Sequence, residues 1–266
     1  MQKRHANREM YFEESAKTCG NYYIPYIEGR KPVTSPMSIM EIGCGEGGNL
    51  MPFALRGCKV TGIDVAEGRI GQARHFFSER GLAGSFIHTD FMDMAVPENN
   101  DEKFDVILLH DVIEHVQDKQ GFLAHATGFM KPGGVLFVAF PAWQMPFGGH
   151  QQICRSRVWS RMPFLHLLPS GVYLFVLRHV AHESQGIIDE LHGIRHCKTS
   201  IELFEHTVGQ LDLKIASRVL WLINPHYQQK FGLRPRRLSR AISRIPYVRN
   251  FFSTSCFYIL TLPESH

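Results

Sequence analysis

Residues 40–48 carry the residue types and spacing that most directly imply chemistry. Glu41 precedes a loop that contains Gly43 and Gly45, and glycines let a backbone turn sharply and approach a ligand that a Cβ would block. Asp64 ends the next apolar run, where a carboxylate can accept hydrogen bonds from both hydroxyls of a ribose. Strand, glycine loop, helix, strand and acid together indicate a nucleotide-type cofactor site in a parallel α/β sheet.

These residues leave more than one cofactor open. Gly43-x-Gly45-x-x-Gly48 matches the dinucleotide fingerprint of NAD-type dehydrogenases. Glu41 argues against a dinucleotide, because a carboxylate at the mouth of the loop opposes the charges of a pyrophosphate at a helix N-terminus. S-adenosylmethionine fits better, since it carries an ammonium, a sulfonium and a ribose but no phosphate. A dehydrogenase and a non-catalytic protein that keeps the cofactor fold stay open as alternatives.

The segment Glu41-Ile42-Gly43-Cys44-Gly45-Glu46-Gly47 resembles the first motif of the class I S-adenosylmethionine-dependent methyltransferases, which is an acid, any residue and then Gly-x-Gly-x-Gly. Further segments similar to this family follow in order along the chain: VTGID at 60–64, HTDF at 88–91, FDVILLHDVIEHV at 104–116 and MKPGG at 130–134. The stretch at 104–116 is similar to the ubiquinone-biosynthesis O-methyltransferase-like branch. The resemblance covers roughly residues 38–141.

This resemblance implies a Rossmann-like doubly wound α/β sheet, mostly parallel with an antiparallel C-terminal strand, and S-adenosylmethionine as the cofactor. The residues that it places at the cofactor are Glu41, Gly43, Cys44, Gly45, Asp64, Val65, Asp90, Phe91 and His110. The glycine loop would bind the methionine side, and Asp64 would bind the ribose. Asp90 would hold the exocyclic amine of adenine, and Phe91 would contact adenine through its ring or its backbone. His110 would approach the methionine part through its backbone carbonyl.

The sequence predicts the catalytic residues less directly than the residues that bind the cofactor. Methyl transfer from a sulfonium needs alignment and desolvation, with proton removal only if the acceptor is protonated. His115 and His150 are the predicted catalytic residues, since a neutral histidine has a pKa suited to taking a proton near pH 7. Asp111 and Glu114 are further candidate bases, while Glu114 and His115 also have a structural interpretation as a helix cap and a packed ring. The expected acceptor is small or carrier-linked, and methylation at oxygen is favoured.

The fifteen histidines and six cysteines do not predict a metal site. His192 and His196 lie four apart, and His179 and His182 three apart, so each pair can share a helix face, but no acid or cysteine completes a ligand set and His-Glu-x-x-His is absent. The cysteines are scattered singly and indicate reduced thiols in a cytoplasmic protein. The basic N-terminal residues have no apolar run behind them, so we expect no secretory signal.

The length of 266 residues suits a single methyltransferase domain spanning 1–266. Its expected parts are N-terminal helices over 1–37, a cofactor-binding core over 38–141, a helical cap insertion over 142–198, and a C-terminal sheet completion with a basic insertion over 199–266. Apolar runs typical of buried parallel strands lie at 38–42, 59–64, 85–88, 105–109 and 135–140. Helices are predicted over 66–80 and 201–211, a Pro-Gly-Gly helix stop at 132–134, and two antiparallel strands at 213–223 and 252–262.

Two segments depart from this alternation. Residues 142–198 are rich in aromatic residues and histidine, and we expect this cap to cover the acceptor, with Gly148-Gly149 folding the backbone across the cleft and His150 lining it. Proline, histidine and arginine interrupt its apolar part at 162–181, which argues against a membrane span.

The second segment, Lys230 to Arg249, holds seven cations and no acid in a chain of formal net charge +4. It is either a solvated face or a patch for an anionic group on the acceptor or a membrane surface. No nucleic-acid motif accompanies it, so nucleic acid is an unlikely partner.

Overall fold

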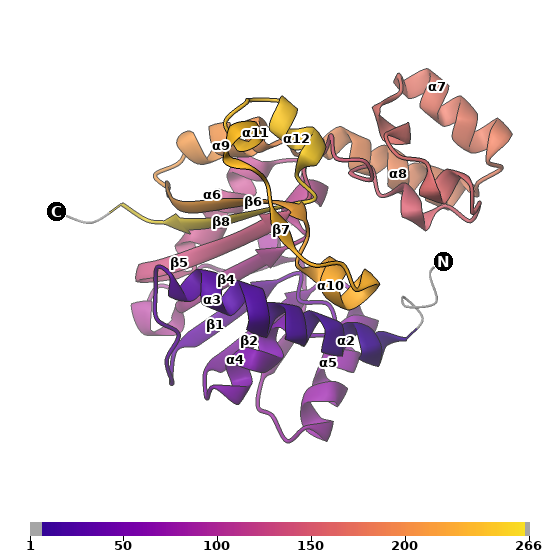
Figure 1. The fold of residues 1–266 in the computed structure, drawn as a ribbon. Helices are drawn as coiled ribbons and strands as arrows, with labels where there is room; N and C mark the ends of the chain where they lie inside the picture. The colour runs from indigo at the N-terminus through magenta and orange to yellow at the C-terminus, as the bar shows by residue number, and fades with distance from the viewer. Residues whose placement is uncertain (1–6, 264–266) are drawn as a thin grey trace.

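The computed structural model describes residues 7–263, so residues 1–6 of the predicted N-terminal helical segment lie outside the described part. One eight-stranded sheet runs through the molecule in the order β3-β2-β1-β4-β5-β8-β6-β7 (Figure 1). The strands are β1 (Ser38–Ile42), β2 (Lys59–Asp64), β3 (Ser85–His88), β4 (Phe104–His110), β5 (Met130–Phe140), β6 (Lys214–Ile223), β7 (Arg236–Arg237) and β8 (Ser255–Thr261).

The first five strands are parallel, and β8 is antiparallel to both β5 and β6. This confirms the predicted fold class, a mostly parallel Rossmann-like sheet closed by an antiparallel C-terminal strand. The strand order reverses between β1 and β4, and ligands of open α/β sheets bind at the carboxyl ends of strands at such a switch point. The fold therefore directs attention to the loops that follow these two strands.

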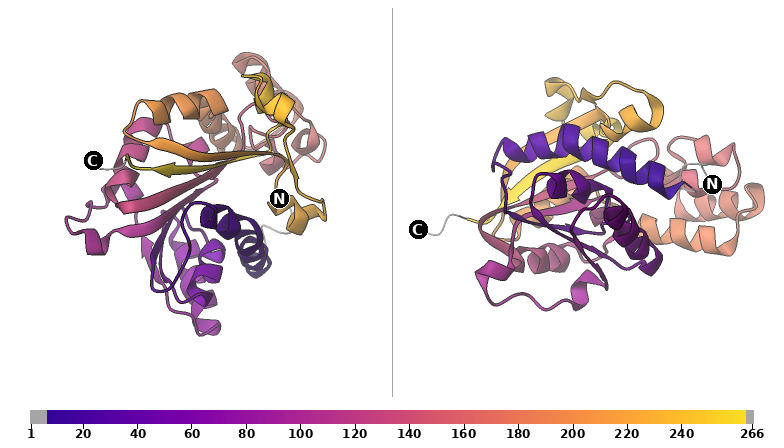
Figure 2. Two further views of the ribbon diagram at one scale, coloured as in Figure 1. Left: turned by 60° about the vertical axis from the view of Figure 1, so that its left-hand side comes forward. Right: turned by 90° about the horizontal axis from the view of Figure 1, so that it is seen from below.

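Helical layers cover both faces of the sheet, as the views in Figure 2 show. One layer contains α2 (Arg8–Thr18), the π-helix η1 (Cys19–Tyr23), α3 (Ile24–Glu28), α4 (Met51–Leu55) and α5 (Glu67–Glu79), and the other contains α6 (Lys119–Gly128) and α9 (Ile201–Gly209). Neighbouring strand residues point to opposite layers. Ile39 and Leu108 join the core cluster under α2, whereas Met40 and Leu109 join the cluster under α6.

Strand β5 differs from the sequence prediction at its start. The Pro-Gly-Gly turn at 132–134 was expected to stop a helix, but α6 already ends at Gly128 and the three residues lie inside β5. Met130 pairs with Phe104 and Val135 with Val106, with a register shift between them, and Gly133 takes a φ of +70°. The turn residues are accommodated as an irregularity of the strand.

Residues 142–198 build a lobe of short helices at one side of the sheet (Figure 1). Its elements are η6 (Gln151–Ile153), η7 (Trp159–Arg161), η8 (Leu165–Leu167), α7 (Ser170–Phe175), the π-helix η9 (Val176–Val180) and α8 (Gln185–Cys197). The lobe has a core cluster of its own, which includes Leu165, Tyr173 and Leu191. A Cβ at Gly149 would come within 2.1 Å of the His166 Cβ, so a glycine is needed where the chain enters this lobe.

The segment between β6 and β8 contains α10 (His226–Phe231), β7, α11 (Arg240–Ser243) and α12 (Val248–Phe252). The sequence did not predict β7, which pairs antiparallel with β6 at the sheet edge. Arg249 is also not the solvated cation that the basic stretch suggested. It is buried, and its guanidinium forms ion pairs with Glu202 at 2.9 Å and Glu205 at 2.8 Å. In the described part of the chain, every helix is too short or too polar to span a membrane.

Candidate functional site

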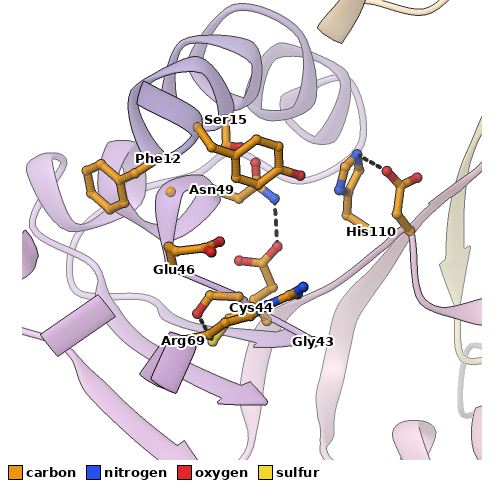
Figure 3. Close-up of a pocket in the computed structure, with 13 residues that line it drawn as sticks. Phe12, Ser15, Gly43, Cys44, Glu46, Asn49, Arg69 and His110 are labelled. Atoms are coloured by element: carbon orange, nitrogen blue, oxygen red, sulfur yellow. Dashed lines mark hydrogen bonds and ion pairs between the residues drawn. The ribbon is translucent and has the colours of Figure 1, made fainter. Parts of the chain in front are cut away.

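A narrow pocket of about 100 Å³ lies at the carboxyl ends of β1 and β4, where the strand order reverses. Four parts of the chain form its walls (Figure 3). The lining residues are Tyr11, Phe12 and Ser15 from α2, Glu41, Gly43, Cys44, Gly45, Glu46, Gly48 and Asn49 from β1 and its loop, Arg69 from α5, and His110 and Asp111 at the end of β4. We call this the glycine-loop pocket.

The glycines of this loop are required by close approaches of other elements. Gly43 has a φ of +70°, and a Cβ there would lie 2.4 Å from Cγ2 of Val112 after β4. A Cβ at Gly48 would lie 2.5 Å from the backbone oxygen of Phe12 in α2. Helix α2 therefore packs directly on the loop, and an ion pair of 2.6 Å between Arg8 and Glu46 holds it there. The loop and the N-terminal helix form one site.

Glu41 presents an incompletely satisfied carboxyl group at the end of β1. One oxygen, Oε1, accepts a hydrogen bond of 2.7 Å from the Asn49 amide (Figure 3). The other, Oε2, is buried and has no hydrogen-bond partner among residues 7–263. Burial raises the Glu41 pKa to about 8, and the charge of Asp64 adds to the rise, whereas the hydrogen bond from Asn49 lowers the pKa and opposes it. A positively charged ligand group would supply the missing partner and favour the carboxylate.

Asp64 lies at the end of β2 with 8% of its surface exposed. Its Oδ2 accepts a hydrogen bond of 2.9 Å from the Gly45 amide, and its Oδ1 accepts one of 2.8 Å from the Ala66 amide. These bonds fix the carboxylate against the glycine loop. A carboxylate has about four lone-pair positions, so each oxygen retains one for a ligand hydroxyl.

The residues predicted for adenine lie outside the lining of the pocket. Asp90 is exposed and accepts a hydrogen bond from the Met92 amide at the start of η3 (Phe91–Asp93). The Phe91 ring is buried against Phe122 and Phe129 in the core under α6. Of the two contacts predicted for Phe91, only the one through its backbone is therefore left. Val65 is 67% exposed beside Asp64 and offers an apolar surface.

His110 contributes its imidazole as well as its backbone to the pocket wall. Its Nε2 lies 2.8 Å from the hydroxyl of Tyr23 in η1 and 3.7 Å from Oδ2 of Asp111. Asp111 has a φ of +53°, an unusual value for a residue other than glycine. Its side chain is 46% exposed. Strained backbone of this kind clusters at functional sites, and here it holds a carboxylate at the pocket edge.

Glu114, His115 and His150 meet where η5 (Ile113–His115) touches the lobe of residues 142–198. Their ligand atoms all lie within 4.8 Å of one another, and the two histidine rings are 5.0 Å apart between centroids. Burial raises the Glu114 pKa, with the charge of Asp111 adding to the rise, and both of its oxygens lack a partner among the described residues. Burial lowers the His115 pKa and brings that of His150 to about 4, the latter helped by His115.

We call these three residues the Glu-His-His cluster. Burial favours the neutral form of all three groups. The cluster can therefore form hydrogen bonds with a hydroxyl group, and its ligand atoms lie close enough together to hold a cation. The sequence predicted no ligand set around the pairs His192/His196 and His179/His182, and the group that the structure brings together is a different one, in which Glu114 and His115 meet His150 from a distant segment. The pair His179 and His182 does not share a helix face, since η9 ends at Val180 and His182 has a φ of +52°.

Sequence reasoning missed several residues at this site. Tyr11 and Ser15 line the pocket from α2. Tyr227 in α10 approaches from the C-terminal segment, and burial together with the charge of Asp111 raises its pKa to about 12. No local motif marks these residues, because they reach the site only through the packing of α2 and α10. Asn49 could have been predicted from the sequence, since it directly follows the last glycine of the loop.

Known proteins confirm the class that this fold defines. Residues 40–138 match the family model described as a methyltransferase domain. The ubiquinone biosynthesis O-methyltransferase of Paramagnetospirillum magneticum is 37% identical over 105 residues, which is 39% of this chain and 40% of that protein. The enzyme of the same name from Bartonella tribocorum is 34% identical over 124 residues, or 45% and 49% of the two chains. The chain thus spans half or less of the length of these relatives.

Solved structures support the same fold over nearly the whole chain. The plantazolicin methyltransferase BpumL, solved with S-adenosylhomocysteine, covers 98% of this chain and 88% of its own at a TM-score of 0.56 and 14% identity. The structure of a putative sarcosine dimethylglycine methyltransferase from Galdieria sulphuraria covers 93% of this chain and 85% of its own, at a TM-score of 0.59 and 13% identity. Residues 40–138 therefore match a methyltransferase domain, and the chain has the fold of S-adenosylmethionine-dependent methyltransferases, as predicted.

Proposed function

We propose that this chain binds S-adenosylmethionine in the glycine-loop pocket and transfers its methyl group to an oxygen of a small or carrier-linked acceptor. The observation that carries the proposal is the buried Oε2 of Glu41, which has no partner within the described chain. The Glu41 carboxyl group stands at the glycine loop near Asp64. Together they offer one acidic group for an ammonium and one for the hydroxyls of a ribose. The O-methyltransferase names of the relatives support oxygen as the accepting atom.

The residues present fit the parts of this cofactor in order. Glu41 would bind the ammonium, and the guanidinium of Arg69 lines the same pocket as a partner for the carboxylate. The pocket of about 100 Å³ suits only this amino-acid end, since whole-ligand sites measure about 300 Å³ or more. The ribose would then lie on Asp64 and the adenine along Val65, Asp90 and the backbone of residue 91. The sulfonium supplies a methyl group already activated for displacement.

The acceptor would lie between Asp111 and the Glu-His-His cluster. Asp111 lines the glycine-loop pocket, and its charge also acts on Glu114, His115 and His150, so it connects the two groups. His115 would accept the proton of the acceptor hydroxyl at an imidazole nitrogen as the methyl group is transferred. His150, with a pKa of about 4, is a weaker base and would instead orient the acceptor by a hydrogen bond.

The two alternatives make different demands on the same pocket. A pyrophosphate in the glycine loop carries no donor for the buried Oε2 of Glu41 and would be repelled by the ionised form of this group, which disfavours a dinucleotide. A protein that binds the cofactor without turnover would keep the glycine-loop pocket but would not need the unsatisfied groups of the Glu-His-His cluster. Turnover is therefore the measurement that separates this alternative from an enzyme.

The proposal is tested by calorimetric titration with S-adenosylmethionine, S-adenosylhomocysteine and NAD. We expect both sulfur compounds to bind with comparable affinity, since the homocysteine form lacks only the methyl group, and NAD to bind at least tenfold more weakly. Release of S-adenosylhomocysteine in the presence of a library of phenols and carboxylic acids then identifies the acceptor. Binding of NAD without either sulfur compound would overturn the assignment of the cofactor.

A further inference from the structure

A second cavity, of about 400 Å³, opens between the N-terminal helices and the outer edge of the sheet. Its walls include Tyr22, Pro25, Tyr26 and Arg30 from the segment of η1 and α3, together with Trp221 of β6 and Arg237 of β7. It shares no lining residue with the glycine-loop pocket. We call it the edge cavity, and nothing in the proposed methyl transfer uses it.

Three of the six named wall residues are aromatic: Tyr22, Tyr26 and Trp221. Tyr22 stands edge-on to Trp221 with ring centroids 6.0 Å apart, and Tyr26 packs on Phe257 of β8 at 5.8 Å. Trp221 is 8% exposed, and its indole nitrogen has no hydrogen-bond acceptor in the described part of the chain. Rings of this kind contribute large apolar contact areas to a planar ligand. The cavity is therefore shaped for a flat, mainly apolar molecule.

Two guanidinium groups at this cavity have no counter-ion within the described part of the chain. Arg237 lies over the Trp221 ring, with its Cζ 5.8 Å from the centroid. Neither Arg237 nor Arg30 forms an ion pair with a carboxylate of residues 7–263. Both act electrostatically on the Tyr26 hydroxyl. Burial raises the Tyr26 pKa to about 12, while a hydrogen bond with Ser217 and the two positive charges oppose the rise. The cavity thus combines apolar walls with uncompensated positive charge.

We propose that the edge cavity binds a small aromatic carboxylate, with its ring against the touching side chains of Tyr22 and Trp221 and its carboxylate on Arg30 and Arg237. A volume of about 400 Å³ falls within the usual range of small-ligand sites, roughly 300–1,000 Å³. Guanidinium groups bind planar carboxylates through paired hydrogen bonds. The apolar walls favour such a ligand over an inorganic anion.

The edge cavity is connected to the glycine-loop pocket through η1. Tyr22 lines the cavity, whereas the next residue, Tyr23, places its hydroxyl 2.8 Å from Nε2 of His110. The two side chains belong to a π-helix, an irregularity frequent at functional sites. A ligand that fixes Tyr22 would therefore also restrict Tyr23, so occupancy of the cavity is expected to change cofactor affinity by a small factor.

The test is a titration of the protein with benzoate, its neutral relative benzamide, and inorganic phosphate, followed by tryptophan fluorescence and calorimetry. We expect saturable binding of benzoate, with benzamide and phosphate at least tenfold weaker. Arg237→Gln and, from a different element, Arg30→Gln should each weaken benzoate binding at least fivefold. Arg236→Gln is the matched control, because Arg236 is the neighbouring exposed residue of β7 and lies outside the lining. It should leave benzoate affinity unchanged.

Several results would overturn the proposal. One is the absence of saturable benzoate binding to a protein whose thermal unfolding is normal. Others are equal affinities for benzoate and benzamide, which would remove the role of charge, or equal losses in Arg236→Gln and Arg237→Gln. Tight binding of phosphate would remove the role of the aromatic walls. Competitive displacement of benzoate by saturating S-adenosylhomocysteine would place benzoate in the glycine-loop pocket and not in the edge cavity.

Discussion

Two buried glutamates stand at the carboxyl edge of the sheet, and their surroundings differ. Glu41 lies near the end of β1, with one oxygen bound to Asn49 and the other without a partner among residues 7–263. Glu114 follows β4 and has no partner for either oxygen in the described residues, with two histidines close by. Burial raises the pKa of both carboxyl groups. The first needs a single positive group, and the second needs several partners at once.

This difference separates the site into two halves with different origins. The Glu41 half is built almost entirely from one loop and the helix that packs on it, and a carboxylate fixed by backbone amides completes it. The Glu114 half needs His150, which comes from the lobe of residues 142–198. The local construction of the Glu41 half suits a defined cofactor, and the contribution of a separate lobe to the Glu114 half suits an acceptor that differs between proteins. Perturbing each half alone should therefore give separable effects on binding and on turnover.

Removing the Asp64 carboxylate should have the largest effect on the cofactor half. Asp64→Ala deletes the expected ribose acceptor and leaves the amides of Gly45 and Ala66 without partners, so affinity for S-adenosylmethionine should fall by about 1–3 kcal/mol. Calorimetric titration measures this loss. Asp93→Ala, which removes an exposed acid of η3, is the control and should bind normally. Unchanged affinity in Asp64→Ala would remove Asp64 from the site.

The pH dependence of cofactor binding tests the role of Glu41. The free carboxyl group has a pKa of about 8 and is mostly protonated at pH 6, whereas the ammonium of the ligand requires the carboxylate. Affinity for S-adenosylhomocysteine should therefore rise by about twentyfold between pH 6 and pH 8, with proton release, until the amine of the ligand itself loses its proton near pH 8. Glu41→Gln should bind weakly at every pH. A wild-type affinity that falls over this range would contradict the assignment.

The same group affects the stability of the free protein. Its folded pKa of about 8 lies above its ordinary value of 4.5, so between these values the folded state holds more protons than the unfolded state. The unfolding free energy should fall as pH rises from about 5 to 8, and the slope should be smaller in Glu41→Gln. Thermal unfolding of the ligand-free protein over this range measures both slopes. Identical slopes would show that Glu41 titrates normally.

Changes in the cluster half should act on turnover and not on the cofactor. His150→Ala should lower kcat by roughly tenfold, a modest effect for a group that orients a reactant near an acid–base step, while affinity for S-adenosylmethionine stays within twofold. The measurement is a comparison of turnover with calorimetric binding. His196→Ala, which changes an exposed histidine of α8 in the same lobe, should alter neither quantity. Equal loss of turnover and cofactor binding, or loss of neither, would remove the acceptor from this position.

The cofactor half could be predicted from the sequence because its determinants are local. Buried parallel strands read as continuous apolar runs, and the glycines lie a fixed number of residues from Glu41 and Asp64. The strands at 38–42, 59–64 and 85–88 begin and end at the predicted residues. The Phe91 ring was harder to place, since its burial depends on Phe122 of α6 and on Phe129 directly after that helix, both more than thirty residues away in the chain.

The rest of the molecule depends on long-range contacts that no local pattern encodes. Arg249 belongs to a run of cations in the sequence, but its acids lie in α9, 47 and 44 residues away. Strand β7 has only two residues and forms because β6 offers an open edge beside it. The Glu-His-His cluster joins η5 to the lobe of residues 142–198, and the sequence spacing of its members does not indicate that they meet.

The smallest expected effect concerns the exposed cations of the 230–249 stretch, which we propose as a contact for an anionic membrane surface or acceptor. Arg249 is paired and Arg237 lies over Trp221, so the relevant change is the reversal of Arg236 and Arg240, which are both exposed. The double variant should bind vesicles of phosphatidylglycerol a few-fold more weakly than the unchanged protein at low salt. The difference should vanish at high salt, where the Debye length falls to about 3 Å. Sedimentation with these vesicles, and with neutral phosphatidylcholine vesicles as a reference, measures the effect.

A charge-matched variant that reverses the exposed Lys59 and Lys214 should bind as the unchanged protein does, because these residues lie in β2 and β6, outside the stretch. Equal binding by all three proteins at low salt would leave the stretch as a solvated face.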